Sequence, residues 1–474
     1  ITTLQFEPPP PLERNGLPLL TRSVIEDTSL PLFLMKGTRP MPEFSTETRR
    51  TNLLLVSNDI VDTKMAGPGA RYLEMARALS DSLEVTLAIP NETNLQIPGV
   101  RILTYQEDRA ESLQVLVQNH EQVLISGYML LKFPFLKDTR TRLIVDWYDP
   151  FYLENFYYYL DRPMEEQFEH NATAISMVND LAKVGDFFIC GNERQRDLWI
   201  GILAANRRIN PLTLKDDETL RKLIDVVGVG IPERSPNPKP MLKGVRPEFP
   251  PDCRIILWGG GIWNWLDPLS LVQAWPEVIN ARPDARLVFL GTRHPNPNVP
   301  KHEIVDRLIQ AAEDTGEKDR SIFFIEWLSY EDREALLLEA DIGVTLHPIH
   351  AETRYSIRTR VLDYFWARLP VCITKGDVTS EWVETYQVGQ AAPPADSHTL
   401  AEILVAMLAR EKSAYAQGFE TLHDRLAWEK VVEPLRSFAL EGSNAPDRER
   451  FLRTMHMDPA IPEEIIQGTL KRAA

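Results

Sequence analysis

Short apolar runs alternate with amphipathic segments along the chain from about residue 50 onward. In the first half, these runs stand at residues 52–57, 84–89, 122–126, 142–146, 186–190 and 225–229. A helical spacing of apolar residues fills several of the gaps between them, and Leu73, Ala76 and Leu79 share one face of such a segment. Short buried strands that alternate with helices predict a parallel sheet that is covered on both faces.

The same alternation begins again in the second half of the chain. Its apolar runs stand at residues 254–258, 285–290, 321–325, 342–346 and 370–374. The predicted fold class is therefore α/β, with two Rossmann-like, doubly wound domains that face each other across a cleft. Ligands of open parallel sheets bind beyond the carboxyl ends of the strands, so we expect the functional loops to follow strands.

Proline-rich stretches mark the expected boundaries of the domains. Pro8-Pro9-Pro10-Pro11 opens a segment with little periodicity, and seven prolines separate the two strand–helix series. The expected parts are an N-terminal extension (1–48), a first domain (49–229), a linker (230–252), a second domain (253–430) and C-terminal helices (431–474).

Composition excludes several classes of function. The 474 residues include 52 Lys and Arg against 68 Asp and Glu, and the formal net charge is −16. This balance argues against binding nucleic acid through a basic face and against a polybasic membrane anchor. The three widely spaced cysteines suggest neither a disulfide framework nor a zinc knuckle. We expect a cytoplasmic protein whose membrane contact, at the inner face, is at most peripheral.

Each half carries a glycine-containing turn after its first predicted strand. Gly67-Pro68-Gly69 precedes a helical segment, and Gly259-Gly260-Gly261 directly follows a strand. Small residues let backbone N–H groups approach a ligand, and the start of a helix favours an anion. The second turn therefore suits a phosphate, whereas the first is either a ligand loop or a plain tight turn. Neither has the spacing of a dinucleotide fingerprint or a P-loop.

Three arginines follow the strand at residues 342–346, and they are Arg354, Arg358 and Arg360. If the last two lie in the first turn of the next helix, they face the cleft together. Cations at a helix N-terminus are unfavourable unless an anion binds there, so this spacing indicates an anion site. The alternative is a solvated basic loop that pairs with Glu352 and Asp363.

Two aspartates stand at the end of a strand in the first half. Asp146 and Asp149 flank Tyr148, and carboxylates at such a position can accept hydrogen bonds from hydroxyl groups. Asp149 precedes Pro150, so it is equally typical of a turn. We treat these residues as candidates for the acceptor side of a site.

In this order and spacing, the segments resemble the retaining, sugar-nucleotide-dependent glycosyltransferases of family 4, which have the GT-B fold. The nearest resemblance is to members associated with bacterial surface polysaccharides, and it covers about residues 50–430. It is carried by the first-domain glycine loop with Arg71, the Gly259–Gly261 turn and the segment Ser356…Arg360-x-x-Asp363-Tyr-Phe-Trp-Ala-x-Leu-Pro370.

The resemblance implies that the first domain lies on the acceptor side and the second on the donor side, and that the C-terminal helices (431–474) cross back to the first domain. It also implies roles for individual residues. Gly259, Gly260 and Gly261 would lie at the donor diphosphate, with Arg358 and Arg360 supplying positive charge. Asp363 falls where the family has a glutamate that binds the ribose. The remaining implied positions are Arg293 and Trp327 beside the nucleobase, and Gly67, Gly69, Arg71, Asp146, Tyr148 and Asp149 around the donor sugar and acceptor.

Two departures from the family pattern concern the catalytic residues. Tyr355 stands where the family has its first glutamate, and Glu352 is the candidate to take over that role. The arginine–lysine pair that many members place after the second-domain glycine turn is absent. The predicted catalytic residues are therefore Glu352, Arg358 and Arg360.

The function that follows is transfer of a hexosyl or deoxyhexosyl group from a nucleoside-diphosphate sugar, with retention, in glycan or polysaccharide biosynthesis. The acceptor would be a carbohydrate, a lipid-linked sugar or a small molecule. We expect no nucleic-acid partner, no cofactor and no metal, with arginines in place of a cation. Two alternatives stay open, namely a non-catalytic nucleotide-sugar-binding member or partner subunit and a sugar-nucleotide epimerase.

Overall fold

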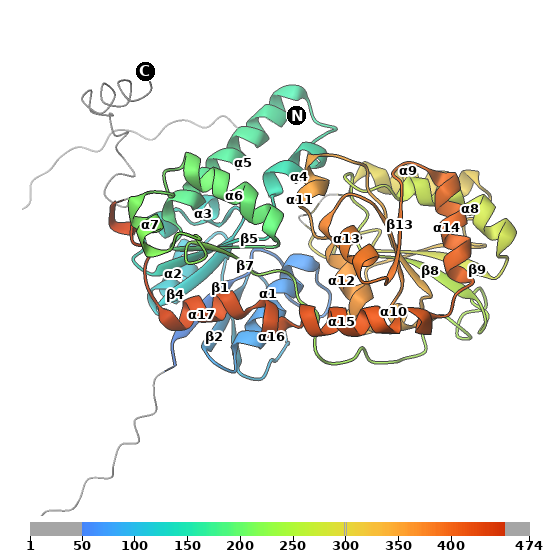
Figure 1. The fold of residues 1–474 in the computed structure, drawn as a ribbon, viewed down its shortest axis with the longest axis horizontal. Helices are drawn as coiled ribbons and strands as arrows, with labels where there is room; N and C mark the ends of the chain where they lie inside the picture. Colours follow the sequence, from blue (N-terminus) through green and yellow to red (C-terminus); the bar gives the residue numbers. More distant parts are fainter. Residues whose placement is uncertain (1–49, 298, 300, 451–474) are drawn as a thin grey trace, which may run out of the picture. The chain divides into compact units, whose positions relative to one another are not determined.

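The computed structural model describes residues 50–297, 299 and 301–450, and the account below is confined to them. The predicted N-terminal extension and the last part of the predicted C-terminal helices lie outside the described residues. The rest of the chain forms two parallel sheets with helices around them (Figure 1).

The first sheet consists, within the described residues, of seven parallel strands in the order β3-β2-β1-β4-β5-β6-β7. The strands are β1 (Asn52–Val56), β2 (Glu84–Ile89), β3 (Val100–Thr104), β4 (Gln122–Ser126), β5 (Arg142–Trp147), β6 (Phe187–Cys190) and β7 (Ile224–Val226). The associated helices are α1 (Gly67–Leu79), α2 (Ala110–Gln118), α3 (Met129–Lys132), η1 (Pro134–Asp138), α4 (Phe151–Tyr158), α5 (Met164–Val184), α6 (Glu193–Ala205) and α7 (Pro211–Asp216).

The second sheet has six parallel strands in the described part of the chain, in the order β10-β9-β8-β11-β12-β13. They are β8 (Arg254–Gly259), β9 (Ala285–Leu290), β10 (Ile322–Ile325), β11 (Ile342–Thr345), β12 (Val371–Thr374) and β13 (Gly389–Ala392). The helices of this half are α8 (Pro268–Ala281), α9 (Glu303–Asp314), α10 (Tyr330–Glu339), α11 (Ala351–Tyr355), α12 (Thr359–Trp366), α13 (Val378–Thr385), α14 (Ser397–Leu408), η2 (Lys412–Tyr415) and α15 (Ala416–Leu426).

These two doubly wound sheets confirm the predicted fold class. The strands sit at the predicted apolar runs because both faces of each sheet are buried. In β1, Leu54 and Val56 pack into one core cluster while Leu53 and Leu55 pack into another on the opposite face. Burying one such side chain contributes about 1.5–3 kcal/mol to stability.

Two edge strands, β3 and β13, were not predicted from the sequence. Only one of their residues, Ala392, is fully buried, and the others are half-buried or exposed. An edge strand of this kind has no continuous apolar run, so the pattern that indicates the central strands is missing.

The segment 230–252 contains no helix or strand, yet it packs against the second half of the chain. Leu242 and Phe249 are buried in a core cluster of that half, and the indole of Trp366 donates a hydrogen bond to the carbonyl of Arg234 at 2.6 Å. The expected linker is therefore anchored along much of its length.

The chain then returns to the first sheet through α16 (Trp428–Val431) and α17 (Glu433–Glu441), which follow α15 (Figure 1). Leu435 and Ala439 lie in the same core cluster as Leu53, and Gln122 of β4 donates to the carbonyl of Ala439 at 2.7 Å. No helix between residues 50 and 450 is long and apolar enough to span a bilayer.

Candidate functional site

Two helix N-termini, one from each half, lie beside each other. A Cβ atom on Gly67, the first residue of α1, would lie 3.2 Å from the hydroxyl of Thr359, the first residue of α12. Neither helix has a side-chain cap or an acidic residue in its first turn. The free N–H groups and the helix dipoles therefore leave a positive potential at this point, which favours an anion.

Arg360, in the first turn of α12, adds a full positive charge there. Its side chain lies over the ring of Trp258 at 4.9 Å and donates to the carbonyl of Gly261 at 2.6 Å. It forms no ion pair with any residue in the described part of the chain, and its Nη1 is buried without a hydrogen-bond partner. Burial lowers the pKa of Arg360 to about 10. A buried guanidinium with an open donor is suited to binding an anion.

The glycine turn after β8 lies directly beside this arginine. A Cβ on Gly260 would sit 3.6 Å from the guanidinium carbon of Arg360. The N–H of Gly259 donates to the hydroxyl of Tyr364 at 2.7 Å, so that group already has a partner. The part of the turn that contacts Arg360 is therefore Gly260 and Gly261.

Arg358, in contrast, is engaged by carboxylates within its own half. Its two terminal nitrogens each donate to Glu352 at 2.9 Å, and its Nε lies 3.4 Å from Asp377. All three side chains are at least nine-tenths buried. The same Asp377 carboxylate lies 3.4 Å from His347, and His350 lies 3.5 Å from Glu352. We call Glu352, Arg358 and Asp377 the Arg358 cluster.

Two further carboxyl groups interact with this cluster from α4 and the loop before it. Burial raises the pKa of Asp149, and the charge of Glu352 raises it further. Burial likewise raises the pKa of Glu154, followed by the charges of Asp149 and Glu352. This corner of the molecule therefore holds more carboxyl groups than cations, and the carboxyl groups raise one another's pKa values.

Arg71 and Asp146 bind each other. The guanidinium donates to both carboxylate oxygens, at 2.8 and 3.0 Å, and to the carbonyls of Val227 and Gly228 at 2.8 and 2.6 Å. The ring of Tyr148 lies 4.8 Å from the same guanidinium. The three predicted residues, Arg71, Asp146 and Tyr148, therefore lie together. The charges of Arg71 and Asp146 neutralise each other, because the two side chains form an ion pair.

Gly69 is required by the backbone, because a Cβ there would lie 2.2 Å from the carbonyl oxygen of Ile60. Asp363, one turn after Arg360 on α12, pairs with Arg333 of α10 at 3.2 Å. Burial raises the pKa of the Asp363 carboxyl, and the two arginines oppose that rise.

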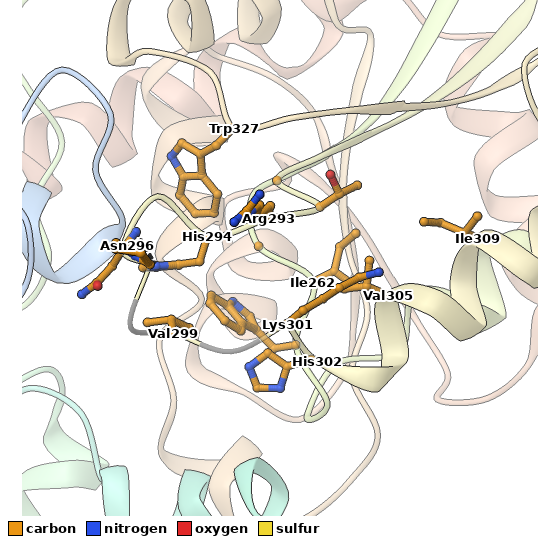
Figure 2. A pocket seen from close by; sticks show the side chains of 15 residues that line it. Ile262, Arg293, His294, Asn296, Val299, Lys301, His302, Val305, Ile309 and Trp327 are labelled. Atoms are coloured by element: carbon orange, nitrogen blue, oxygen red, sulfur yellow. Dashed lines mark hydrogen bonds between the residues drawn. The ribbon is translucent and has the colours of Figure 1, made fainter.

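Arg293 and Trp327 line a cavity of about 530 Å³ beside the glycine turn (Figure 2). The rings of His294 and His302 stand around the same cavity, and burial lowers the pKa of both imidazoles. The Trp327 indole also donates to the carbonyl of Met65 in the first half, at 3.2 Å. The cavity therefore adjoins the Arg360 site through Gly261, and its wall combines aromatic rings with the side chains of Arg293 and Lys301.

Sequence reasoning missed several residues that hold these loops. Asp377 caps α13 by accepting from Ser380 N at 2.6 Å, and Asn192 caps α6 by accepting from Gln195 N at 2.9 Å. The spacing Asn192-x-x-Gln195 is a recognisable sign of a helix start. Nothing in it indicates that both side chains also reach the second half of the chain.

No group of three or more His, Cys, Asp or Glu side chains between residues 50 and 450 is arranged to hold a metal ion.

Residues 253–410 match the family model described as "Glycosyl transferases group 1". This match covers the second sheet, the glycine turn and both helices of the arginine loop. A search of curated proteins finds no match. The second half of the chain is therefore similar, over most of its length, to group 1 glycosyl transferases.

Solved structures match over most of the chain at low sequence identity. Sucrose-phosphate synthase from Thermosynechococcus elongatus is 13% identical with a TM-score of 0.60, covering 82% of this chain and 98% of that one. HepE of Anabaena, solved with UDP and glucose, is 11% identical with a TM-score of 0.58, and the match covers 82% of this chain and 98% of that one. WaaG, a glycosyltransferase involved in lipopolysaccharide biosynthesis, is 13% identical with a TM-score of 0.54, and the match covers 82% of this chain and 100% of that one. These matches establish the GT-B fold.

Proposed function

We propose that the protein transfers a hexosyl or deoxyhexosyl group from a nucleoside-diphosphate sugar to an acceptor hydroxyl, with retention of the anomeric configuration. The observation that carries this proposal is Arg360, a buried cation with an open donor beside a glycine turn and two uncapped helix N-termini. The similarity of residues 253–410, which surround it, to group 1 glycosyl transferases supports the same activity.

The departing diphosphate develops negative charge in the transition state, so donors fixed in advance lower the barrier. In this proposal, Arg360 and the N–H groups at the start of α12 bind that charge. The guanidinium is held by Trp258 and the carbonyl of Gly261, so it needs little reorganisation as the charge develops. A buried arginine is also worth more here than at the surface, because water does not screen it.

In a retaining transfer, the acceptor attacks from the face that the diphosphate leaves, and a diphosphate oxygen can take the acceptor proton. No strong enzymatic base is then needed. We propose that Glu352 acts through Arg358. Its carboxylate oxygens accept hydrogen bonds from both terminal nitrogens of Arg358 at 2.9 Å and so orient the guanidinium. We propose that Asp363 binds the ribose of the donor and that the cavity lined by Arg293 and Trp327 binds its nucleobase. The proposed acceptor is a substrate of glycan biosynthesis. The reaction is proposed to need no metal, because arginine and helix N-termini supply the positive charge.

The test compares two arginines of one loop. Titration calorimetry with UDP, GDP, dTDP, ADP and CDP identifies the diphosphate that the wild type binds, with and without EDTA. Arg360→Gln removes a charged hydrogen bond of about 1.5–3 kcal/mol and should raise its Kd about tenfold to a hundredfold. Arg354→Gln, which changes an exposed arginine six residues earlier, should leave the Kd within about twofold.

Equal affinities in the wild type and in Arg360→Gln would refute the diphosphate site. Binding of none of the five diphosphates would refute the proposed donor class. For a protein that does transfer sugar, NMR of the product then tests retention, because the product must keep the anomeric configuration of the donor.

A second candidate is a nucleotide-sugar-binding protein that does not catalyse transfer. The observation in its favour is that Glu352 is fully buried and bonded to Arg358, so this carboxylate does not present a free oxygen to a substrate. Such a protein would bind a nucleoside diphosphate through Arg360 but would neither hydrolyse nor transfer the sugar. Tight binding without any turnover of the matching nucleoside-diphosphate sugar would favour it.

A further inference from the structure

The side-chain amide of Gln195, in the first turn of α6, joins three separate stretches of backbone. Its oxygen accepts from the N–H of Gly191 at 2.7 Å. Its nitrogen donates to the carbonyl of Tyr148 at 2.8 Å and to the carbonyl of Tyr355 at 3.0 Å. The side chain is only 1% exposed, so each bond forms away from water and its loss would leave a buried polar group unsatisfied.

Tyr355 is the last residue of α11, and carbonyls at the end of a helix have no partner within the helix. Its carbonyl instead accepts two bonds from the first half of the chain, because Asn192 also donates to it at 2.8 Å. Gly191 makes room for this arrangement, since a Cβ there would lie 3.0 Å from the Gln195 oxygen and 3.1 Å from the carbonyl of Tyr148.

Gln195 thereby connects the two loops that carry candidate site residues. One loop runs from Asp146 to Asp149, at the end of β5. The other contains Glu352 and Arg358 on either side of Tyr355. Among the described residues, Gln195 is the side chain that forms hydrogen bonds to both loops. The two donated hydrogen bonds therefore contribute to their relative position, together with the bond from Asn192 to the carbonyl of Tyr355.

We propose that Gln195 is a positioning residue for sugar transfer, which sets the Arg358 cluster against the acceptor-side loop when the two halves of the chain are in contact. This inference rests on the proposed function. Gln195 touches no reacting atom in it, and acts through the carbonyls of Tyr148 and Tyr355. Misplacement of a reacting group by about 1 Å can cost about a hundredfold in rate, so a pair of bonds of this kind is sufficient to affect turnover.

The test is Gln195→Glu, which keeps the shape of the side chain and its acceptor for Gly191 but removes both donated bonds. Its matched control is Gln167→Glu on α5, since Gln167 also donates to two backbone carbonyls, those of Leu160 and Arg162 at 3.2 and 2.8 Å. The two substitutions remove the same number and type of bonds, but only the first affects the loops.

Two measurements are made on both variants and on the wild type. The first is the acceptor-free hydrolysis of UDP-, GDP-, dTDP-, ADP- and CDP-glucose, with the Kd of the matching diphosphate. We expect Gln195→Glu to lower kcat about tenfold to a hundredfold while the Kd stays within about twofold. The second is hydrogen–deuterium exchange of the peptide covering residues 351–358, which should be faster in Gln195→Glu and unchanged in Gln167→Glu.

A kcat equal to that of the wild type, or an equal loss of kcat and diphosphate affinity, would overturn the positioning role. Unchanged exchange in residues 351–358 would overturn it as well. If the wild type binds none of the five diphosphates, the proposed function fails, and the exchange experiment still decides whether Gln195 holds the loop. The two failures are therefore distinguishable.

Discussion

At the scale of single residues, Arg71 and Asp146 form a buried ion pair in the first half of the chain. Both side chains are about 1% exposed or less, and the two charges are joined by two hydrogen bonds. Asp146→Asn leaves the guanidinium buried without its counter-charge, and Arg71→Met does the same to the carboxylate. Each should lower the free energy of unfolding by about 3–5 kcal/mol in urea denaturation.

The double variant, with both substitutions, should lose less than the sum of the two single losses, because no isolated charge remains. Asp424→Asn serves as the control, since its partner Lys430 is 56% exposed and Asp424 is 80% exposed. That variant should change the free energy of unfolding by less than about 1 kcal/mol. Additive losses in the double variant would show that the two charges are not energetically coupled.

The sequence indicates which residues carry charge in the arginine loop, but it does not indicate how they pair. Arg358 and Arg360 look equivalent in the sequence, yet one contacts two carboxylates and the other contacts none among the described residues. The difference arises because Glu352 and Asp377 come from helices on either side of Arg358. Such pairing depends on tertiary geometry, which no local pattern contains.

At the scale of elements, α12 packs against the second sheet where Tyr364 lies beside Gly343 and Gly259. A Cβ atom on Gly343 would lie 2.6 Å from the ring of Tyr364. The Tyr364 hydroxyl donates a hydrogen bond to the carbonyl of Val344 at 3.0 Å. Gly343→Ala should therefore overpack this contact and lower the free energy of unfolding by about 1–3 kcal/mol. The helix that carries Arg360 would also shift, so diphosphate affinity should fall in the same variant.

Gly201→Ala is the matched control for this substitution. Gly201 lies inside α6, and a Cβ there would meet nothing within 4 Å. The added methyl group should raise the free energy of unfolding by about 0.5–1 kcal/mol, because alanine loses less conformational freedom than glycine in a helix. Urea denaturation of both variants should show a lower free energy of unfolding for Gly343→Ala and a higher one for Gly201→Ala. A stabilised Gly343→Ala would contradict the tight packing of Tyr364.

Elements with a strong periodic pattern are the ones the sequence predicts well. Both central strands that precede the glycine turns, β1 and β8, stand where the apolar runs predict them. The five-residue helix α11 has no such pattern, because it is too short to be stable by itself and depends on contacts from the first half. Its position therefore follows from tertiary contacts with Asn192 and Gln195.

At the scale of the whole described chain, the two halves are joined by contacts from several loops. Trp327 bonds Met65, and the N–H of Tyr330 donates to the carbonyl of Thr63 at 2.8 Å. Asn296 adds a bond to Asp59 at 3.0 Å. Most of these bonds involve backbone groups, so side-chain patterns in the sequence give little indication of them. The fold class is predictable because buried residues recur periodically along the chain. The contacts between the two halves follow no periodic pattern, so the sequence does not predict them.

The C-terminal part of the described chain also binds the first half through charge. Arg448 forms a buried ion pair with Asp186 and donates to the carbonyl of Thr139 at 2.8 Å. Burial raises the pKa of the Asp186 carboxyl, and the charge of Arg448 opposes that rise. Arg448→Met should therefore raise the pKa of Asp186 further. At neutral pH the variant should lose about 3–5 kcal/mol of unfolding free energy, since an isolated buried carboxylate remains.

The sign of the pH dependence follows from this shift. A carboxyl whose pKa is higher in the folded than in the unfolded chain binds its proton more tightly when folded, so the free energy of unfolding falls as pH rises through the folded pKa. The deficit of Arg448→Met relative to the wild type should thus be largest at about pH 8 and shrink towards about pH 5. Arg101→Met, in an exposed pair with Glu84, should show no such trend. A deficit independent of pH would mean that Arg448 stabilises the return of the chain through packing rather than through the charge of Asp186.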